Sequence, residues 1–211
     1  DGGVAIGKRA LYNSSGYAQE FVSIGANAAS SLGNNNNIRF VAIGNNSMSG
    51  ANKMWQTTAV GYKSANGAWG WHQGNSVFLG AFCGENYGSV RDNVGVGFSA
   101  LKDGYGHRTI AVGAYSGQSH NGDYNIYLGF EQGKEKTEDS ILRIGRGNLP
   151  IVHGIMTDSG TSSGQTLNFN ADTITFGTLP TSDPGSNQIW KSLTGAIMQG
   201  VEVPVNYNNL S

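Results

Sequence analysis

Nine copies of one short pattern run through roughly the first two thirds of the 211-residue chain. Each copy reads aliphatic, any residue, aliphatic, glycine, with one looser copy that begins at Thr58, and successive glycines are 16 to 19 residues apart. The copies end at Gly7, Gly25, Gly44, Gly61, Gly80, Gly97, Gly113, Gly129 and Gly145. Such a repeat is too short for a pair of helices and shows no helical period. It therefore predicts one coil of a β-solenoid, whose strands hydrogen-bond from coil to coil.

The two faces of each predicted strand differ in the size of their side chains. A period of two places the first and third residues of the pattern on one face and the middle residue on the other. The middle residue is Ala, Ser or Gly in six of the nine copies. We therefore expect close packing against the small-residue face. Because one thin coil buries little apolar surface, we attribute that packing to further chains that lie side by side.

The closing glycine predicts a corner whose backbone conformation other residues avoid. A second small residue follows three positions later in seven copies, and Cys83 is one of these. Cys83 is therefore expected to be a packing residue rather than a nucleophile. A single cysteine excludes an internal disulfide framework. Oligomerisation is a common alternative source of stability.

The composition argues against several classes of partner. The net charge of −1 leaves no electrostatic footprint for nucleic acid or an anionic membrane. No apolar run approaches the roughly 20 residues that span a bilayer, so no membrane insertion is expected. The start at Asp1, without Met or a signal-peptide pattern, indicates a fragment or a processed product.

The repeat carries a resemblance to a known family. The rhythm Val-Ala-Ile-Gly-x-x-Ala, preceded by Asn, Ser or Thr at Ser76, Asn93, Thr109 and Asn125, resembles the head repeat of YadA-like trimeric autotransporter adhesins. The resemblance covers residues 1–149 and implies a trimeric, left-handed parallel β-roll that binds host surfaces. The repeats here are longer than is usual in that family. We expect the extra residues to form outward loops, where binding commonly lies.

All four prolines follow the last repeat, which places a domain boundary near residue 149. The predicted organisation is an all-β chain: a β-roll of nine repeats at 1–149 and a small antiparallel β domain at 150–211. Alternating polar and apolar residues predict short strands at 166–170 and 173–176. The segments 188–190 and 196–198 are expected to form a hairpin.

Two C-terminal stretches resemble segments near the ends of phage tail fibres: 179–185 followed by Ile189 and Trp190, and 144–147 followed by 150–154. This resemblance implies a homotrimeric tail-fibre tip on the virion that binds a bacterial surface polysaccharide or outer-membrane protein without catalysis. It also suggests that the end at Ser211 marks removal of a C-terminal chaperone. The alternatives are a bacterial adhesin head that binds host matrix, a tailspike-type glycan depolymerase, and a structural spacer.

An aromatic group gives the candidate receptor site. Stacked aromatic rings with neighbouring amides hold sugars through apolar contact and hydrogen bonds to hydroxyls. The rings could equally pack between loops or across a trimer interface. The candidate residues are Trp55, Tyr62, Trp69, Trp71, His72, Asn75 and Tyr87.

Other residue patterns are weaker evidence of chemistry. The acidic group Glu131, Glu135, Glu138 and Asp139 offers carboxylates for a glycosidase pair, but lysines interleave with it. The stretch 95–100 matches the dinucleotide fingerprint without a following helix pattern, so no cofactor is expected. The four histidines share no metal-ligand spacing, and we expect no metal. A cross-chain site with one His per chain is the alternative.

Overall fold

The computed structural model describes residues 2–14, 18–33, 37–70, 74–156, 166–171, 189–191 and 197–199. The chain divides into two units, Asp1–Asn170 and Ala171–Ser211, and each is considered by itself. Within the described ranges the backbone forms strands, turns and bends but no helix. No helix that could cross a membrane occurs there.

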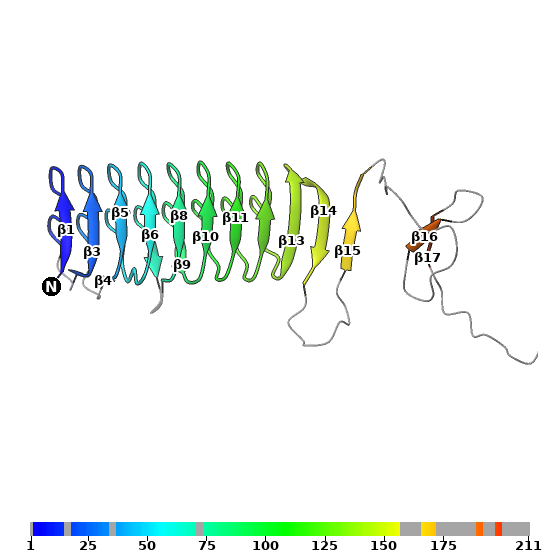
Figure 1. The fold of residues 1–211 in the computed structure, drawn as a ribbon, viewed down its shortest axis with the longest axis horizontal. Coiled ribbons are helices and arrows are strands. Elements are labelled where there is room, and N and C mark those ends of the chain that lie inside the picture. Colours follow the sequence, from blue (N-terminus) through cyan, green and yellow to red (C-terminus); the bar gives the residue numbers. More distant parts are fainter. Residues whose placement is uncertain are drawn as a thin grey trace, which may run out of the picture. The chain divides into compact units, whose positions relative to one another are not determined.

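The first unit is a parallel β-solenoid of about eight turns, as the repeat predicts. All nine copies of the pattern form strands of one sheet, and each strand pairs in parallel with its equivalent in the next coil (Figure 1). The register follows the pattern, since Val94, Gly95 and Val96 pair with Ile110, Ala111 and Val112. These strands are β1 (Gly3–Ile6), β3 (Phe21–Ile24), β5 (Val41–Ile43), β6 (Thr58–Val60), β8 (Val77–Leu79), β10 (Val94–Val96), β11 (Ile110–Val112), β12 (Ile126–Leu128) and β13 (Ile141–Arg146).

Two antiparallel strands extend the same sheet past the last repeat. Strand β14 (Leu149–Ile155) folds back on β13, and β15 (Thr166–Phe169) pairs with β14. The compact unit therefore continues to Asn170, whereas the sequence placed a boundary near residue 149. The prolines marked the end of the repeat, but the hydrogen-bonded sheet continues through Pro150 in β14.

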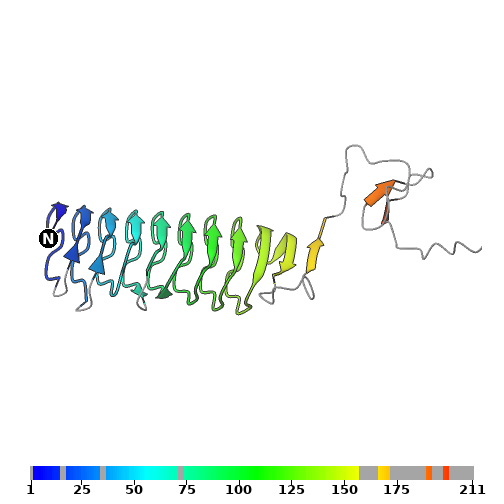
Figure 2. The same cartoon turned by 60° about the horizontal axis from the view of Figure 1, so that its bottom comes forward.

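The remainder of each coil also joins its neighbours through backbone hydrogen bonds. After each of the first eight corner glycines, left-handed residues occupy the second, fourth and sixth positions, as at Ser99, Leu101 and Asp103 (φ 54°, 55° and 53°). Their N–H groups donate alternately to the previous and the next coil; that of Leu101 donates to Ser116 O at 2.9 Å. Figure 2 shows these return segments stacked along the solenoid. Short strands continue the stacking: β2 (Ala18–Gln19), β4 (Asn37–Ile38), β7 (Trp69–Gly70) and β9 (Gly88–Val90).

The middle residue of each strand points into the coil itself. Phe78 and Ala111 are fully buried, and from β3 onward every middle residue is buried. The residue four positions after the corner glycine lies directly opposite the middle residue of the strand. Where one of these two side chains is large, the other is small. A Cβ at Gly84 would lie 2.7 Å from Phe78 Cε1, and a Cβ at Gly95 would lie 3.2 Å from Leu101 Cδ1. The interior is one side chain deep, and this explains the preference for small residues.

This arrangement corrects the expectation that further chains pack against the small-residue face. That face is closed by the return segment of the same chain, so its small residues carry no information about oligomers. The residue three positions after the corner glycine is buried in the same interior; Ser64 Oγ, for example, donates to Phe78 O at 2.9 Å. Cys83 occupies this position and is fully buried, which confirms its role in packing. The face left outside is the aliphatic one.

The corner glycines are required by both conformation and space. Gly97 has a φ of +135°, which L side chains rarely adopt. A Cβ there would lie only 2.6 Å from the carbonyl oxygen of Gly113, the corner of the next coil. The same geometry holds at Gly7 and Gly25. Glycine is therefore needed at each step because the coils approach each other backbone to backbone.

A ladder of buried polar side chains precedes the strands. Asn93 Oδ1 accepts the N–H of Thr109 at 2.9 Å, and Asn93 N donates to Ser76 Oγ at 3.0 Å. Asn125 Oδ1 accepts the N–H of Ile141 at 2.9 Å in the same way. Buried polar groups need such partners. This is the physical role of the Asn, Ser and Thr residues that contributed to the family resemblance.

The second unit is described only at one hairpin. Strand β16 (Ile189–Lys191) pairs antiparallel with β17 (Ile197–Gln199), close to the segments expected from the sequence. The predicted strand at 173–176 and the end at Ser211 lie outside the described residues. A complete antiparallel domain stays a prediction.

Candidate functional site

The outward side of the nine strands carries an aliphatic surface that none of the described residues covers. We call it the outer face. None of its residues is buried, and Ile6 and Ile110 are 56% and 39% exposed. Its members are Val4, Ile6, Val22, Ile24, Val41, Ile43, Thr58, Val60, Val77, Leu79, Val94, Val96, Ile110, Val112, Ile126, Leu128, Leu142 and Ile144. At about 4.8 Å per strand the face is on the order of 40 Å long. Soluble monomers rarely expose so extended an apolar surface.

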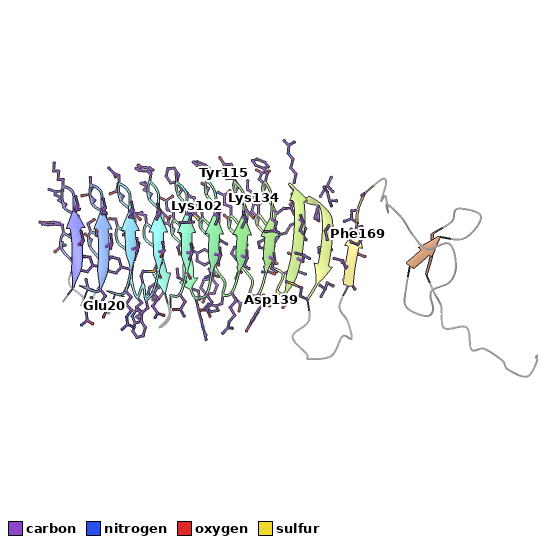
Figure 3. All side chains as sticks on the ribbon, viewed as in Figure 1. Glu20, Lys102, Tyr115, Lys134, Asp139 and Phe169 are labelled. Carbon is purple, nitrogen blue, oxygen red and sulfur yellow. The ribbon has the colours of Figure 1, made fainter. Side chains whose placement is uncertain are left out.

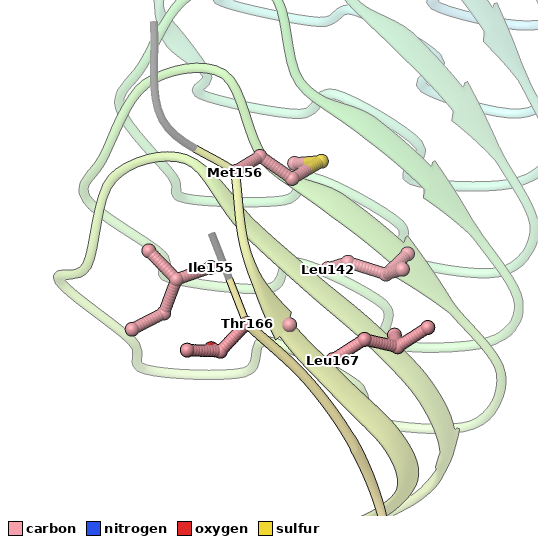
Figure 4. A pocket seen from close by; sticks show the side chains of 6 residues that line it. Leu142, Ile155, Met156, Thr166 and Leu167 are labelled. Carbon is pink, nitrogen blue, oxygen red and sulfur yellow. The ribbon is translucent and has the colours of Figure 1, made fainter. Parts of the chain in front are cut away.

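A shallow apolar groove continues the outer face over the antiparallel strands (Figure 4). Its volume is about 280 Å³. Leu142, Gly154 and Leu167 occupy one row across β13, β14 and β15, and Ile155, Met156 and Thr166 complete the lining. Because most of the lining is apolar, the groove suits apolar side chains better than a polar ligand.

A second surface, the aromatic ladder, lies where the strands end. It consists of Tyr62, Phe82, Phe98, Tyr115 and Phe130, one ring from each of five successive coils. Neighbouring ring centroids are 5.2, 5.5, 5.3 and 5.9 Å apart, and every pair meets edge to face. Figure 3 shows Tyr115 at this edge, near Lys102.

Two lysines and one buried acid accompany the ladder. Glu85 is 6% exposed and accepts a 2.6 Å hydrogen bond from Lys102 Nζ, while Lys63 Nζ lies 3.5 Å from its other oxygen. The hydrogen bond to Glu85 raises the pKa of Lys102 above its usual value, so this ammonium stays charged. Both ammonium groups also lie over Phe82, with Nζ 5.1 and 5.8 Å from the ring centroid.

A third surface, the polar edge, lies where the strands begin. From the second coil onward, the residue five positions before the corner glycine is polar and has a positive φ. Neighbours pair across coils: Arg39 Nε lies 2.8 Å from Glu20 Oε2, and Arg108 Nη1 donates to the Tyr124 hydroxyl at 2.6 Å. Figure 3 shows Glu20 and Asp139 at this edge, opposite Tyr115.

The structure does not bring the predicted receptor residues into one group. Tyr62, 46% exposed, follows the corner Gly61 and belongs to the aromatic ladder. Trp69, 47% exposed, begins β7 on the return segment. Asn75 lies on the polar edge, five positions before Gly80, and its N–H donates to Trp55 O at 2.8 Å. Trp71 and His72 lie outside the described residues.

Tyr87 is a correction, because it lies inside the solenoid and is fully buried. Its hydroxyl donates to Gly106 O at 2.9 Å and lies 3.2 Å from His120 Nε2. Desolvation raises the pKa of Tyr87 and lowers that of His120. His120 Nδ1 donates to Gly117 O at 2.7 Å, and burial favours the neutral imidazole in this core position. Neither residue can meet a receptor.

The other residues considered for chemistry are buried or separated from one another. Burial raises the pKa of the Cys83 thiol to about 12, which disfavours the reactive thiolate. The acidic group is divided between the two edges: Glu131 pairs with Lys134 in the turn after β12, whereas Asp139 accepts the N–H of Asp123 at the polar edge. Among the described residues no three His, Cys, Asp or Glu side chains gather as metal ligands.

Comparison with protein-family models, with curated proteins and with solved structures finds no match for this chain. The functional argument therefore depends on the chain's own residues.

Sequence reasoning missed most of the aromatic ladder. It identified Tyr62 but assigned it to a group of residues near in sequence, and it overlooked Phe98, Tyr115 and Phe130 as surface residues. The signal was available, because each ladder residue follows its corner glycine by one or two positions. Aligning the repeats on the glycine, rather than counting aromatics in a window, places these rings in one row.

Proposed function

We propose that the chain is part of a homotrimeric fibre that attaches to a cell surface without chemical turnover. The observation that carries this proposal is the outer face, eighteen residues in nine strands that the part of the chain described by the structure leaves uncovered. Three chains that meet along these faces would bury them and form a stiff rod. A rod that presents three identical sites gains strength by avidity, which suits attachment.

The number three comes from the resemblance to the adhesin head repeat. The structure supports the comparison indirectly, because the Asn, Ser and Thr residues of the repeat form a buried ladder and the aliphatic residues face outward. The outer face is only two residues wide on each strand. Such a narrow face also suits a three-fold axis, where each chain contacts two neighbouring chains.

The chemistry of the described residues favours binding over catalysis. The carboxylates that suggested a depolymerase are separated, and Glu138 is paired with Arg143 at 3.1 Å. Cys83 and His120, the residues most often recruited as nucleophile and base, are enclosed in the interior.

We propose that this attachment occurs on a virion, at the distal tail fibre, with a bacterial polysaccharide or outer-membrane protein as the receptor; the C-terminal stretches that resemble phage fibres support this proposal. The exposed Trp69 stays a predicted contact for such a receptor, as do Trp55 and Asn75. A bacterial adhesin head that binds host matrix is the competing function.

Cell attachment tests the proposal directly. The fluorescently labelled chain is expected to bind intact bacteria from a panel of species and not collagen- or fibronectin-coated surfaces. Binding to matrix alone would favour the adhesin function, and binding to neither would contradict attachment. Release of soluble glycan from the bacteria would contradict the absence of turnover. Loss of binding in a Trp69→Ala, Trp71→Ala variant would place the contact on the return segment.

A further inference from the structure

We propose that the aromatic ladder is a binding site for an acidic polysaccharide, an inference that rests on the attachment function proposed above. The five rings are not part of the folding core. Phe98 and Phe130 are 44% and 41% exposed, and each ring packs on its ladder neighbours rather than in the interior. A single chain therefore displays a linear aromatic surface that its own folding does not require.

The spacing of the rings suits a linear polymer of sugars. One ring per coil gives centroid separations of 5.2 to 5.9 Å along five coils. A polysaccharide presents an apolar C–H face at regular intervals, and aromatic rings bind such faces. The edge-to-face contacts hold the rings in a fixed zigzag, so little side-chain entropy is lost when a ligand binds.

The charge beside the rings selects an acidic polymer. Glu85 is almost enclosed, with 8% of its side chain exposed, whereas the side chains of Lys63 and Lys102 are 35% and 26% exposed. A ligand on the ladder therefore meets two ammonium groups. The single carboxylate neutralises only one of these two positive charges. At the far end the Arg146 guanidinium lies 5.7 Å from the Phe130 centroid. The neighbouring carboxylate, Glu131, is paired with Lys134 at 3.6 Å, so the two charges offset each other and Arg146 adds a positive charge. Carboxylates of uronic or sialic acids would pair with these cations.

The opposite edge supplies a matched control. The polar edge also carries aromatic rings and cations, such as Tyr124 with the Arg108 guanidinium 5.2 Å from its centroid. There, however, Arg108 is paired with Asp92 at 3.5 Å, and that carboxylate is itself accessible at 36%. An acidic polymer would meet both signs of charge at that edge.

Affinity electrophoresis of the full chain tests the site with alginate, hyaluronan and polysialic acid as acidic probes and dextran as the neutral one. We expect retardation by at least one acidic probe, weakened by salt, and none by dextran. A Phe98→Ser, Tyr115→Ser variant is expected to bind about tenfold more weakly, as the loss of ring contacts implies. A Tyr124→Ser variant is expected to bind as the parent does.

Each other result overturns the site. No retardation by any acidic probe, or equal retardation by dextran, contradicts an acidic glycan ligand. Unchanged binding in the Phe98→Ser, Tyr115→Ser variant places the ligand elsewhere. If that variant instead changes the mass of the particle in light scattering while retaining its β circular dichroism, the ladder is a contact between chains.

The result is separable from the proposed attachment function. Bacteria that bind the parent chain and the Phe98→Ser, Tyr115→Ser variant equally contradict the ladder and leave attachment intact. Bacteria that do not bind the parent chain contradict attachment itself, whatever the electrophoresis shows.

Discussion

The inner and outer sides of the nine strands differ in what packs against them. Ala111 and Ile110 are adjacent residues of β11; Ala111 is fully buried under the return segment of its own coil, and Ile110 is 39% exposed. The inner side is complete within one chain, with sizes matched across an interior one side chain deep. The outer side is also apolar, and no residue within the described ranges covers it. Folding of the chain therefore depends on the first side, and assembly would depend on the second.

The largest difference in stability is expected when one aspartate is introduced on the inner side or on the outer side of a strand. Ala111→Asp buries an unpaired carboxyl group and should destabilise the fold by about 4 kcal/mol or more, enough to leave little folded protein. Ile110→Asp places the same group in solvent and should keep the β circular dichroism. Similar loss of folded protein in both variants would contradict the difference between the two sides.

A smaller effect tests the size matching inside the coil. Leu101→Ala should cost about 3 kcal/mol, because it opens a cavity in the interior. Gly95→Ala should also destabilise, since its Cβ would lie 2.7 Å from Cys83 Sγ and 3.2 Å from Leu101 Cδ1. The double variant should cost less than the sum, by about 1 kcal/mol, because the smaller Leu101 makes room. Strict additivity in urea unfolding would show that the two residues do not compensate.

Two glycine substitutions should separate the energetic cost of close contact between coils from the cost of backbone strain. Gly97→Ala combines a φ of +135° with a Cβ 2.6 Å from Gly113 O and should cost about 3 kcal/mol. Gly50→Ala is the control, since Gly50 has a φ of +68° but no atom within 4 Å of the new Cβ. It should cost about 1 kcal/mol. Equal costs in thermal unfolding would mean that the contact between coils contributes nothing.

The mildest test is the pH dependence of the interior. Desolvation lowers the pKa of His120 below its usual 6.5, so the unfolded chain binds the proton more readily than the folded chain. Stability should be complete above about pH 6.5 and decline as the pH falls through the folded-state value. Thermal midpoints between pH 7.5 and 5.5 should fall more steeply for the parent than for His120→Gln. Identical slopes would contradict a buried neutral imidazole.

The fold could be predicted from sequence because the repeat encodes it at every step. Each corner glycine, such as Gly97, marks a site that no other residue fits, and nine such sites fix the register. The assignment of inside and outside could not be derived in the same way. A small residue such as Ala59 fits equally against its own return segment or another chain, and only the geometry of the coil distinguishes these.

The candidate site was less predictable, for a related reason. Tyr87 and Trp69 are one repeat apart and Trp69 N donates to Tyr87 O, yet Tyr87 points into the solenoid and Trp69 is exposed. Trp69 aligns with Gly88, so Tyr87 corresponds instead to the buried Ala68. In a solenoid, residues on one surface are neighbours at intervals of a whole repeat. The aromatic ladder is visible only when Tyr62, Phe98 and Phe130 are aligned on their corner glycines.

The central claim is that the outer face is covered by further copies of the same chain. Sedimentation equilibrium of the parent chain, with Ile110→Asp as the comparison, tests it most directly. The parent is expected at three times the chain mass of 22.2 kDa, and the variant at the mass of one chain with its β structure intact. A parent particle of 22.2 kDa across the micromolar range would contradict the claim.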